Sequence, residues 1–550
     1  MPLVEAVLAL IAACIGFALL ARRLRLPYAV ILVLGGMALA FIPGLPQVRL
    51  DPELALAFFL PPLLQASAFR TDWRSFRSNL RPILLLAVGC VVFTALCIGA
   101  LAKYLVPELP WAAAIALGAI VAPPDAVAAG AVLSRLRLPR RLVTVLEGES
   151  LVNDATALVL YRFAVAAVGA GALAPWDGIG EFLLLAAGGV AMGWVVGRAA
   201  IWVQARLEDT LLETALGFLA CYASYLAAEA LHLSGVIAVV TTGLAMGRAQ
   251  HRIAGPRSRL AGRAVWDFLE FILNSLVFIL IGLQLNDILG RLDGRPWWEI
   301  VGIALALAAA LILSRFLWVF PATWLPRLIP AVRRHVPIQP WAEATIISWA
   351  GMRGVVSLAA ALALPMDFPQ RDLIVFLAFT AILATLVLQG TTLEWLIRRL
   401  HAEVPAHAGG IDPEEAEARH LSARAALDEI ERRLTDPLEG AIAADLVPEF
   451  RDRARHLHRT AENRGAVAAE RAARRRLRLD SLEAARASLI EQHRQGRLHE
   501  EGLARLELEL DLEELRVRQA LGDERTEAER RAAEQRRREQ TGWAAFFAQS

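Results

Sequence analysis

The chain has 550 residues, of which 56% are hydrophobic, and its 57 basic and 55 acidic residues leave a formal net charge of only +2. A soluble domain could not keep so much apolar surface away from water, which argues against a soluble globular protein. Both signs of charge are interleaved in the C-terminal part, so no basic stripe for binding nucleic acid is formed.

The apolar residues are concentrated in one part of the chain. Residues 1–398 hold nearly all the long apolar runs, whereas the rest is rich in Arg, Glu, Ala and Leu. We therefore predict a transmembrane domain over 1–398, a linker over 399–411 and a helical cytoplasmic tail over 412–550. For the tail we consider two hypotheses, a regulatory role and a solvated bundle that packs on itself.

The apolar runs have the length of membrane-spanning helices. The hydrocarbon core is about 30 Å thick, so one helical crossing needs about 20 residues. The segments at 142–171 and 340–366 are long and contain polar residues, so we expect them to be tilted or broken. We predict an all-α polytopic membrane protein of about thirteen spans, at 3–21, 27–44, 53–69, 82–105, 110–133, 142–171, 179–204, 211–230, 234–249, 265–289, 297–321, 340–366 and 371–397.

The loops between these spans alternate in charge. One set of alternate loops contains 20 basic residues and the other set contains 5. The positive-inside rule assigns the richer set to the cytoplasm. The first apolar run is preceded by Glu5 and by no basic residue, so we interpret it as a span and not as a signal peptide. We expect a multi-pass protein of the inner (plasma) membrane, with its N-terminus outside and its tail in the cytoplasm.

The first polar motif within a span is VAPPDAV at residues 121–127. Pro123 and Pro124 remove two backbone donors, so the helix is expected to unwind there. Unwound backbone at membrane depth is tolerated where it lines a cavity, and its free carbonyls can bind a cation. Asp125 at the break adds an anionic oxygen. The alternative interpretation, that Asp125 caps the following half-helix, is compatible with an ion site.

The second motif is EGESLVNDA at residues 147–155. Ser150 and Asp154 are four residues apart and share one helix face, while Glu149 and Asn153 share the neighbouring face. A charged side chain at this depth costs several kcal/mol, about 3 on insertion scales, so it rarely persists without a function. The first face offers a hydroxyl and a carboxylate to a hard cation, and the second holds a carboxylate for a positive partner.

The third motif is WAGMRGVVS at residues 349–357. Arg353 is always charged and lies in the middle of its span, so snorkelling to an interface is an unattractive alternative. Gly351 and Gly354 on either side permit a break or a close backbone approach. We predict a structural ion pair between Arg353 and Glu149, which leaves Asp125 and Asp154 for the ion.

Together the segments PPDAV, GESLVNDA and GMRGVVSLAAAL resemble motifs of the monovalent cation/proton antiporters, in their Na⁺/H⁺ exchanger (NhaP-like) branch. The likeness extends in order and spacing over residues 1–398. It implies inverted six-helix repeats, two broken helices that cross in mid-membrane, and a homodimer. By the same resemblance, the cation and the proton bind at Asp154, Asp125, Ser150 and Asn153, with Na⁺ at the two aspartates, and Glu149 and Arg353 form the structural ion pair.

Two positions depart from the family pattern. Pro124 stands where many members have threonine, and the segment LPPLLQA at 60–66 lacks the acidic residue that many members carry after the paired prolines. Gln65 or Ser67 is the expected substitute. Both departures concern the ligands of the ion.

We predict a secondary active transporter that exchanges Na⁺ or Li⁺ for H⁺ by alternating access, without ATP or a cofactor. Because Asn153 stands where a second aspartate would add a charge, the exchange is expected to be electroneutral. The alternatives are K⁺/H⁺ exchange, an ion channel and an ion-sensing membrane protein. Enzymatic activity is not expected, since the sequence contains no nucleophile elbow, nucleotide loop or metal-ligand cluster.

Overall fold

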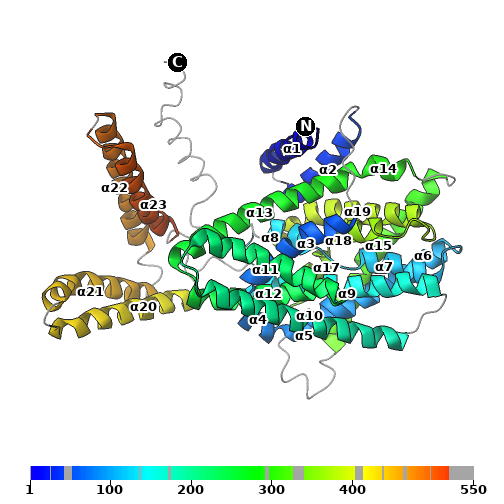
Figure 1. Ribbon diagram of the computed structural model, residues 1–550, viewed down its shortest axis with the longest axis horizontal. Coiled ribbons are helices and arrows are strands. Elements are labelled where there is room, and N and C mark those ends of the chain that lie inside the picture. The colour runs from blue at the N-terminus through cyan, green and yellow to red at the C-terminus, as the bar shows by residue number, and fades with distance from the viewer. Residues whose placement is uncertain are drawn as a thin grey trace. The chain divides into compact units, whose positions relative to one another are not determined.

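The structure is a computed structural model (Figure 1). It describes residues 2–24, 26–42, 52–133, 136, 138–170, 175–291, 296–325, 340–402, 413–436, 439–462, 468–495 and 497–519. The chain divides into two compact units, Met1–Val404 and Pro405–Ser550.

Every regular element within the described residues is helical. The first unit contains α1 (Pro2–Leu24), α2 (Tyr28–Ala40), α3 (Pro52–Arg70), α4 (Trp73–Ser78), α5 (Leu80–Leu84), the π-helix η1 (Leu85–Cys90), α6 (Val91–Leu105), α7 (Trp111–Val121), α8 (Ala126–Leu133), α9 (Arg140–Ala170), α10 (Pro175–Gln204), α11 (Thr210–Ala230), α12 (Gly235–Ile253), α13 (Pro256–Leu283), α14 (Leu285–Leu289), α15 (Trp297–Trp324), α17 (Trp341–Trp349), α18 (Val355–Leu362) and α19 (Arg371–Arg399).

Each predicted span overlaps one helix or two or three consecutive helices. Among the described residues, seven helices are long and apolar enough to cross a membrane: Leu80–Leu105, Arg140–Gly169, Leu183–Gln204, Thr210–Ala230, Pro256–Leu289, Trp297–Trp324 and Arg371–Arg399. The total of thirteen crossings, the inverted repeats and the topology stay predictions.

The two long polar segments behave differently. The segment at 340–366 is divided into α17 and α18, whereas α9 runs unbroken for 31 residues. At 1.5 Å per residue α9 is about 46 Å long, well beyond the thickness of the hydrocarbon core, so a tilt or an extension out of the membrane accommodates it.

The helices of the first unit pack as two bundles. One bundle consists of α1–α3 with α10–α13, and the other of α4–α9 with α15–α19. Contacts between the bundles are sparser and involve chiefly α2, α3 and α12 on one side and α9, α18 and α19 on the other. A boundary of this kind is where a ligand cavity is expected in a helical protein.

Glycines allow helices of the first bundle to approach closely. Gly189, Gly193 and Gly197 follow one another every fourth residue on α10 and face α12. A Cβ at Gly193 would overlap the carbonyl oxygen of Ala238 on α12. Helices in lipid associate through such small residues, because the apolar tails provide no hydrophobic driving force between them.

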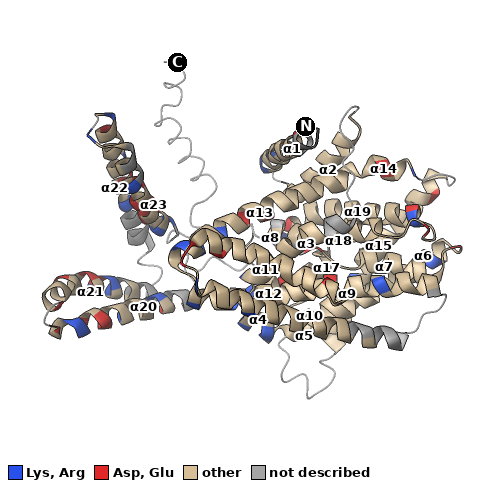
Figure 2. Ribbon diagram, in the orientation of Figure 1, with Lys and Arg blue, Asp and Glu red and all other residues tan. Residues whose placement is uncertain are grey.

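The second unit is made of charged helices. It contains α20 (Pro413–Arg432), the 3₁₀ turn η3 (Arg433–Thr435), α21 (Gly440–Glu462), α22 (Ala468–Arg494) and α23 (Glu500–Gln519). α20 packs against α21 and α22 against α23, as two helical hairpins. Figure 2 shows that these helices contain many charged residues of both signs, whereas the helices of the first unit consist mostly of uncharged residues.

Candidate functional site

The site begins where two helices are interrupted and meet. α7 ends at Val121 and α8 begins at Ala126, while α17 ends at Trp349 and α18 begins at Val355. The amide of Asp125 in the first break donates a hydrogen bond of 2.7 Å to the carbonyl of Met352 in the second. Pro123 and Pro124 cause the first break, because neither can donate to the preceding turn.

Gly354 permits the close contact between the two breaks. A Cβ at this position would overlap the carboxylate of Asp125. Its φ of −146° is not in the left-handed region, so the argument for glycine here is the space that the Asp125 carboxylate occupies. Gly351 lies in the same break, where its carbonyl accepts a hydrogen bond from Arg353.

Asp125 caps the N-termini of both half-helices that follow the breaks. Its carboxylate accepts a hydrogen bond of 2.8 Å from the amide of Val127, and the amides of Ala128 and Val355 also donate to it. Helix N-termini carry partial positive charge and unpaired amides, so one carboxylate satisfies the ends of α8 and α18 together. The capping interpretation of Asp125 therefore describes its contacts, and its carboxylate also lines a cavity.

Arg353 has the complementary position at the ends of the preceding half-helices. Its side chain is buried, and its guanidinium donates to the carbonyl of Val121 at 2.6 Å and to that of Gly351. These carbonyls stand at or just beyond the C-termini of α7 and α17, where partial negative charge favours a cation. In the two breaks, the Asp125 carboxylate therefore compensates the N-termini of α8 and α18, and the Arg353 guanidinium compensates the C-termini of α7 and α17.

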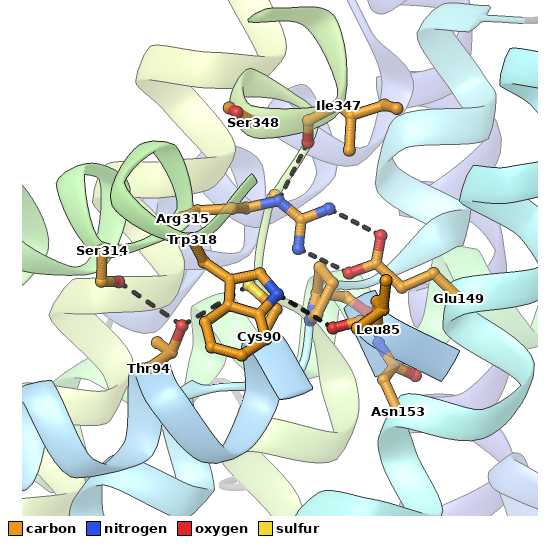
Figure 3. Close-up of polar contacts among 12 residues, drawn as sticks. Leu85, Cys90, Thr94, Glu149, Asn153, Ser314, Arg315, Trp318, Ile347 and Ser348 are labelled. Carbon is orange, nitrogen blue, oxygen red and sulfur yellow. Dashed lines mark hydrogen bonds and ion pairs between the residues drawn. The ribbon is translucent and has the colours of Figure 1, made fainter. Parts of the chain in front are cut away.

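The predicted ion pair between Glu149 and Arg353 was wrong. Glu149 instead pairs with Arg315 of α15, through two hydrogen bonds of 2.5 and 2.6 Å between fully buried side chains (Figure 3). The difference arises from the hydrogen-bond acceptors that are available to each of the two arginines. Arg353 lies in a break with free carbonyls, whereas Arg315 lies within an unbroken helix and donates to one carbonyl among the described residues, that of Ile347 at 2.9 Å. A buried guanidinium in that position needs a carboxylate.

The π-helix packs next to this ion pair (Figure 3). The indole of Trp318, one turn after Arg315, donates a hydrogen bond of 2.9 Å to the carbonyl of Leu85, where the π-helix begins. This contact fixes α15 against the helix of the fourth predicted span.

A cavity of about 70 Å³ lies at the boundary of the two bundles. The second bundle contributes Asp154 and Ser150 of α9, Asp125 and both prolines of the break, and Gly354 at the start of α18. Asp125 and Asp154 are close enough for their charges to interact. The structure thus brings together the two carboxylates and the serine that the sequence predicted as ligands.

The first bundle forms the opposite wall of the cavity. This wall is largely apolar, with Phe59, Leu60 and Leu63 of α3, and it includes the polar residues Ser67 and Asn274. Gln65 does not line the cavity, because its amide faces α11 and α12, where it contacts the carbonyl of Gly217 at 3.5 Å. Of the two expected substitutes for the missing acid, Ser67 is therefore the one at the cavity.

Asn153 has a different position from the other predicted ligands. It is fully buried, its side-chain amide donates a hydrogen bond of 2.7 Å to the carbonyl of Pro124, and it is not among the residues that line the cavity. It therefore ties α9 to the unwound segment, where it positions Asp125.

Two features of the site were missed from the sequence. Arg315 could have been found by the rule applied to Arg353, that an intramembrane arginine needs a compensating charge. Ser357 was included in the third motif without a role, and the structure places it on the cavity wall. Within the described residues, no three His, Cys, Asp or Glu side chains form a metal-binding group.

Comparisons with known proteins give a consistent result. A family model described as "Sodium/hydrogen exchanger, transmembrane" matches residues 7–399. An uncharacterized Na⁺/H⁺ exchanger of Mycobacterium tuberculosis is 35% identical over 536 residues, covering 93% of this chain and 95% of the relative. The Na⁺/H⁺ antiporter ApNhaP of Aphanothece halophytica is 35% identical over 378 residues, covering 68% of this chain and 70% of the relative.

A solved structure is similar in fold. It is that of the sodium proton antiporter MjNhaP1 from Methanocaldococcus jannaschii at pH 8, with a TM-score of 0.56 and 20% sequence identity. The match covers 73% of this chain and 99% of that chain.

Proposed function

The chain belongs to the sodium/hydrogen exchanger family, whose members are integral membrane transporters and not enzymes, and on this basis we propose that it exchanges Na⁺ or Li⁺ for H⁺ at Asp154. The observation that supports this site most directly is the cavity between the two bundles, which Asp154 and Asp125 both line. A pair of carboxylates beside a hydroxyl is a typical set of oxygen ligands for a hard cation.

The mechanism that we propose is competition at one carboxylate. A proton bound to an oxygen of Asp154 removes the lone pair and the charge that would hold a cation, so the two ligands exclude each other. Either ligand neutralises the same single charge. Asp125, whose oxygens are occupied by the amides of α8 and α18, keeps its hydrogen bonds in both states. One charge is therefore exchanged for one, and the cycle is electroneutral.

Movement of the second bundle against the first would give alternating access. An empty site carries an uncompensated charge, which is costly to move past the apolar wall of the cavity. A site filled by H⁺ or by Na⁺ is neutral and can pass. Coupling then needs no ATP, because a loaded site alone can change sides. Asn153, Glu149 and Arg315 hold the second bundle together during this movement.

Flux across reconstituted vesicles tests the proposal. In proteoliposomes with an internal pH dye, an outward Na⁺ gradient is expected to drive proton uptake by the wild-type protein, and Asp154→Asn is expected to reduce it to the level of empty liposomes. Asp287→Asn is the matched control, because that carboxylate is partly exposed and pairs with Arg291 one turn away on the surface. Its flux should equal that of the wild type.

The same assay separates the remaining possibilities. Substituting Li⁺ or K⁺ for Na⁺ gives the ion preference, and adding valinomycin with K⁺ tests electroneutrality, since an electroneutral exchange does not respond to a membrane potential. Sodium-dependent proton flux retained by Asp154→Asn would refute the assignment of the site.

A further inference from the structure

We propose that the hydroxyl of Ser357 is a further ligand of the transported cation and contributes to the choice among alkali cations. The proposal rests on the exchange activity proposed above and extends it by one residue. Ser357 belongs to the third sequence motif, at residues 349–357, and the sequence analysis gave it no role.

The first observation concerns an unsatisfied polar atom. The side chain of Ser357 is only 1% exposed, and its Oγ has no hydrogen-bond partner among the described residues. Buried hydroxyls in native proteins are nearly always hydrogen-bonded, and an exception calls for a reason, such as a role in binding a ligand. Serine hydroxyls within helices usually donate to a carbonyl of the preceding turn, as Ser348 of α17 does to Ala344.

The second observation concerns position. Ser357 lines the same cavity as Ser150, Asp125 and Asp154. It stands in the first turn of α18, two residues after Val355, whose amide donates to Asp125. Within the second bundle, polar side chains therefore reach the cavity from three elements: α9, the first break and α18. A site that surrounds a cation needs ligands from several elements, and α18 adds Ser357 to the two carboxylates and Ser150.

The chemistry of a hydroxyl suits this position. Its oxygen offers lone pairs to a hard cation in the way that water does, so it can replace part of the hydration shell. It adds no charge, so the one-for-one exchange at Asp154 is unaffected. A fixed neutral oxygen contributes more to a cation of matching radius than to a larger or smaller one, so we expect its loss to alter the ratio of affinities as well as their size.

The chain provides a matched control on α13. Ser275 is likewise buried, at 0% exposed, and its Oγ is also without a partner among the described residues. Unlike Ser357, it is not among the residues that line the cavity. The two serines thus share burial and an unsatisfied oxygen, and they differ in access to the cavity.

The test measures apparent affinities for Na⁺, Li⁺ and K⁺ in proteoliposomes. Ser357→Ala should raise the half-saturating Na⁺ concentration by about fivefold to tenfold and change the order or ratio of the three ions. Ser357→Thr, which keeps the hydroxyl, and Ser275→Ala should both remain within about twofold of the wild type. Calorimetric titration of the purified proteins with NaCl gives the same comparison without depending on transport.

The outcomes distinguish the two proposals. Wild-type exchange with an unchanged affinity and ion order in Ser357→Ala would overturn the role of Ser357 and leave the proposed function standing. Absence of Na⁺/H⁺ exchange by the wild-type protein would overturn the proposed function itself. If Ser357→Ala does not give folded protein, Ser357→Cys is compared with Ser357→Thr. Weaker binding in the cysteine variant alone supports the ligand role, and equal binding in the two overturns it.

Discussion

At the scale of single residues, the membrane unit neutralises its buried charges in three ways. Arg315 uses a carboxylate, Arg353 uses the carbonyls of broken helices, and Asp125 uses the amides of two helix starts. From the sequence we predicted a partner for Arg353 and placed Asp125, Asp154, Ser150 and Asn153 in one site. The partner predicted for Arg353, Glu149, was wrong, because the pairing depends on where free carbonyls lie in three dimensions.

The ion pair of Glu149 with Arg315 leads to a stability prediction. Glu149→Gln leaves the guanidinium of Arg315 buried without a counter-charge, so the free energy of unfolding should fall by about 3–5 kcal/mol. Thermal unfolding of the detergent-purified protein measures this. In double-mutant cycles, Glu149 should couple strongly to Arg315 and weakly to Arg353. Stronger coupling to Arg353 would restore the pairing that the sequence suggested.

At the scale of helices, features that depend on the local backbone could be predicted from the sequence, whereas features that depend on packing between helices could not. The paired prolines before Asp125 and the glycines around Arg353 predicted both breaks, because these residues act on their own backbone. The π-helix at Leu85–Cys90 had no comparable signal, since the contact that accompanies it, from Trp318, comes from 233 residues further along the chain. Nor did the long polar run of α9 indicate by itself whether it would break or stay whole.

The glycine stripe of α10 gives a prediction with an internal control. Gly193→Ala should lower the free energy of unfolding by about 1–3 kcal/mol, because the added methyl overlaps the backbone of α12. Gly302→Ala on α15, where a Cβ meets nothing within 4 Å, should be neutral or stabilising by up to about 1 kcal/mol. Equal melting temperatures for the two variants would show that α10 and α12 do not pack in this way.

The hairpin of α22 and α23 in the tail should depend on pH. Burial raises the pKa of Glu514, but hydrogen bonds and charge from Arg486 and Arg518 outweigh burial and hold that pKa below its ordinary value of 4.5. A carboxyl group whose pKa is lower in the folded than in the unfolded state stabilises the fold at pH values above its unfolded-state pKa. This contribution is lost as the pH falls through the folded-state pKa. The protection of residues 468–519 from hydrogen exchange, corrected for the intrinsic pH dependence of amides, should therefore fall below about pH 4.5.

Glu514→Gln is the control for this prediction. The variant should exchange faster than the wild type at pH 7, because the charge that holds Arg486 and Arg518 is gone. Its exchange, corrected for the intrinsic pH dependence of amides, should change less between pH 7 and pH 4. An identical pH response in variant and wild type would exclude Glu514 as the titrating group.

At the scale of the whole molecule, the chain divides into two compact units, Met1–Val404 and Pro405–Ser550, and the domains predicted from the sequence, at 1–398 and 412–550, stay predictions. The grouping of helices into two bundles could not be predicted from the sequence. Apolar periodicity shows that a helix is buried in lipid or protein, and it does not show against which helix. That grouping matters, because the cavity with Asp125 and Asp154 lies on the boundary between the bundles.

The central claim is that a proton and a cation exclude each other at Asp154, and proton release on cation binding tests it most directly. The purified protein is titrated with NaCl by calorimetry in buffers of different protonation enthalpy, over a range of pH. At pH values where the site is protonated before Na⁺ is added, we predict release of about one proton per Na⁺ bound, and no release from Asp154→Asn. Sodium binding to the wild type without proton release at any pH, or equal release from the variant, would contradict the account.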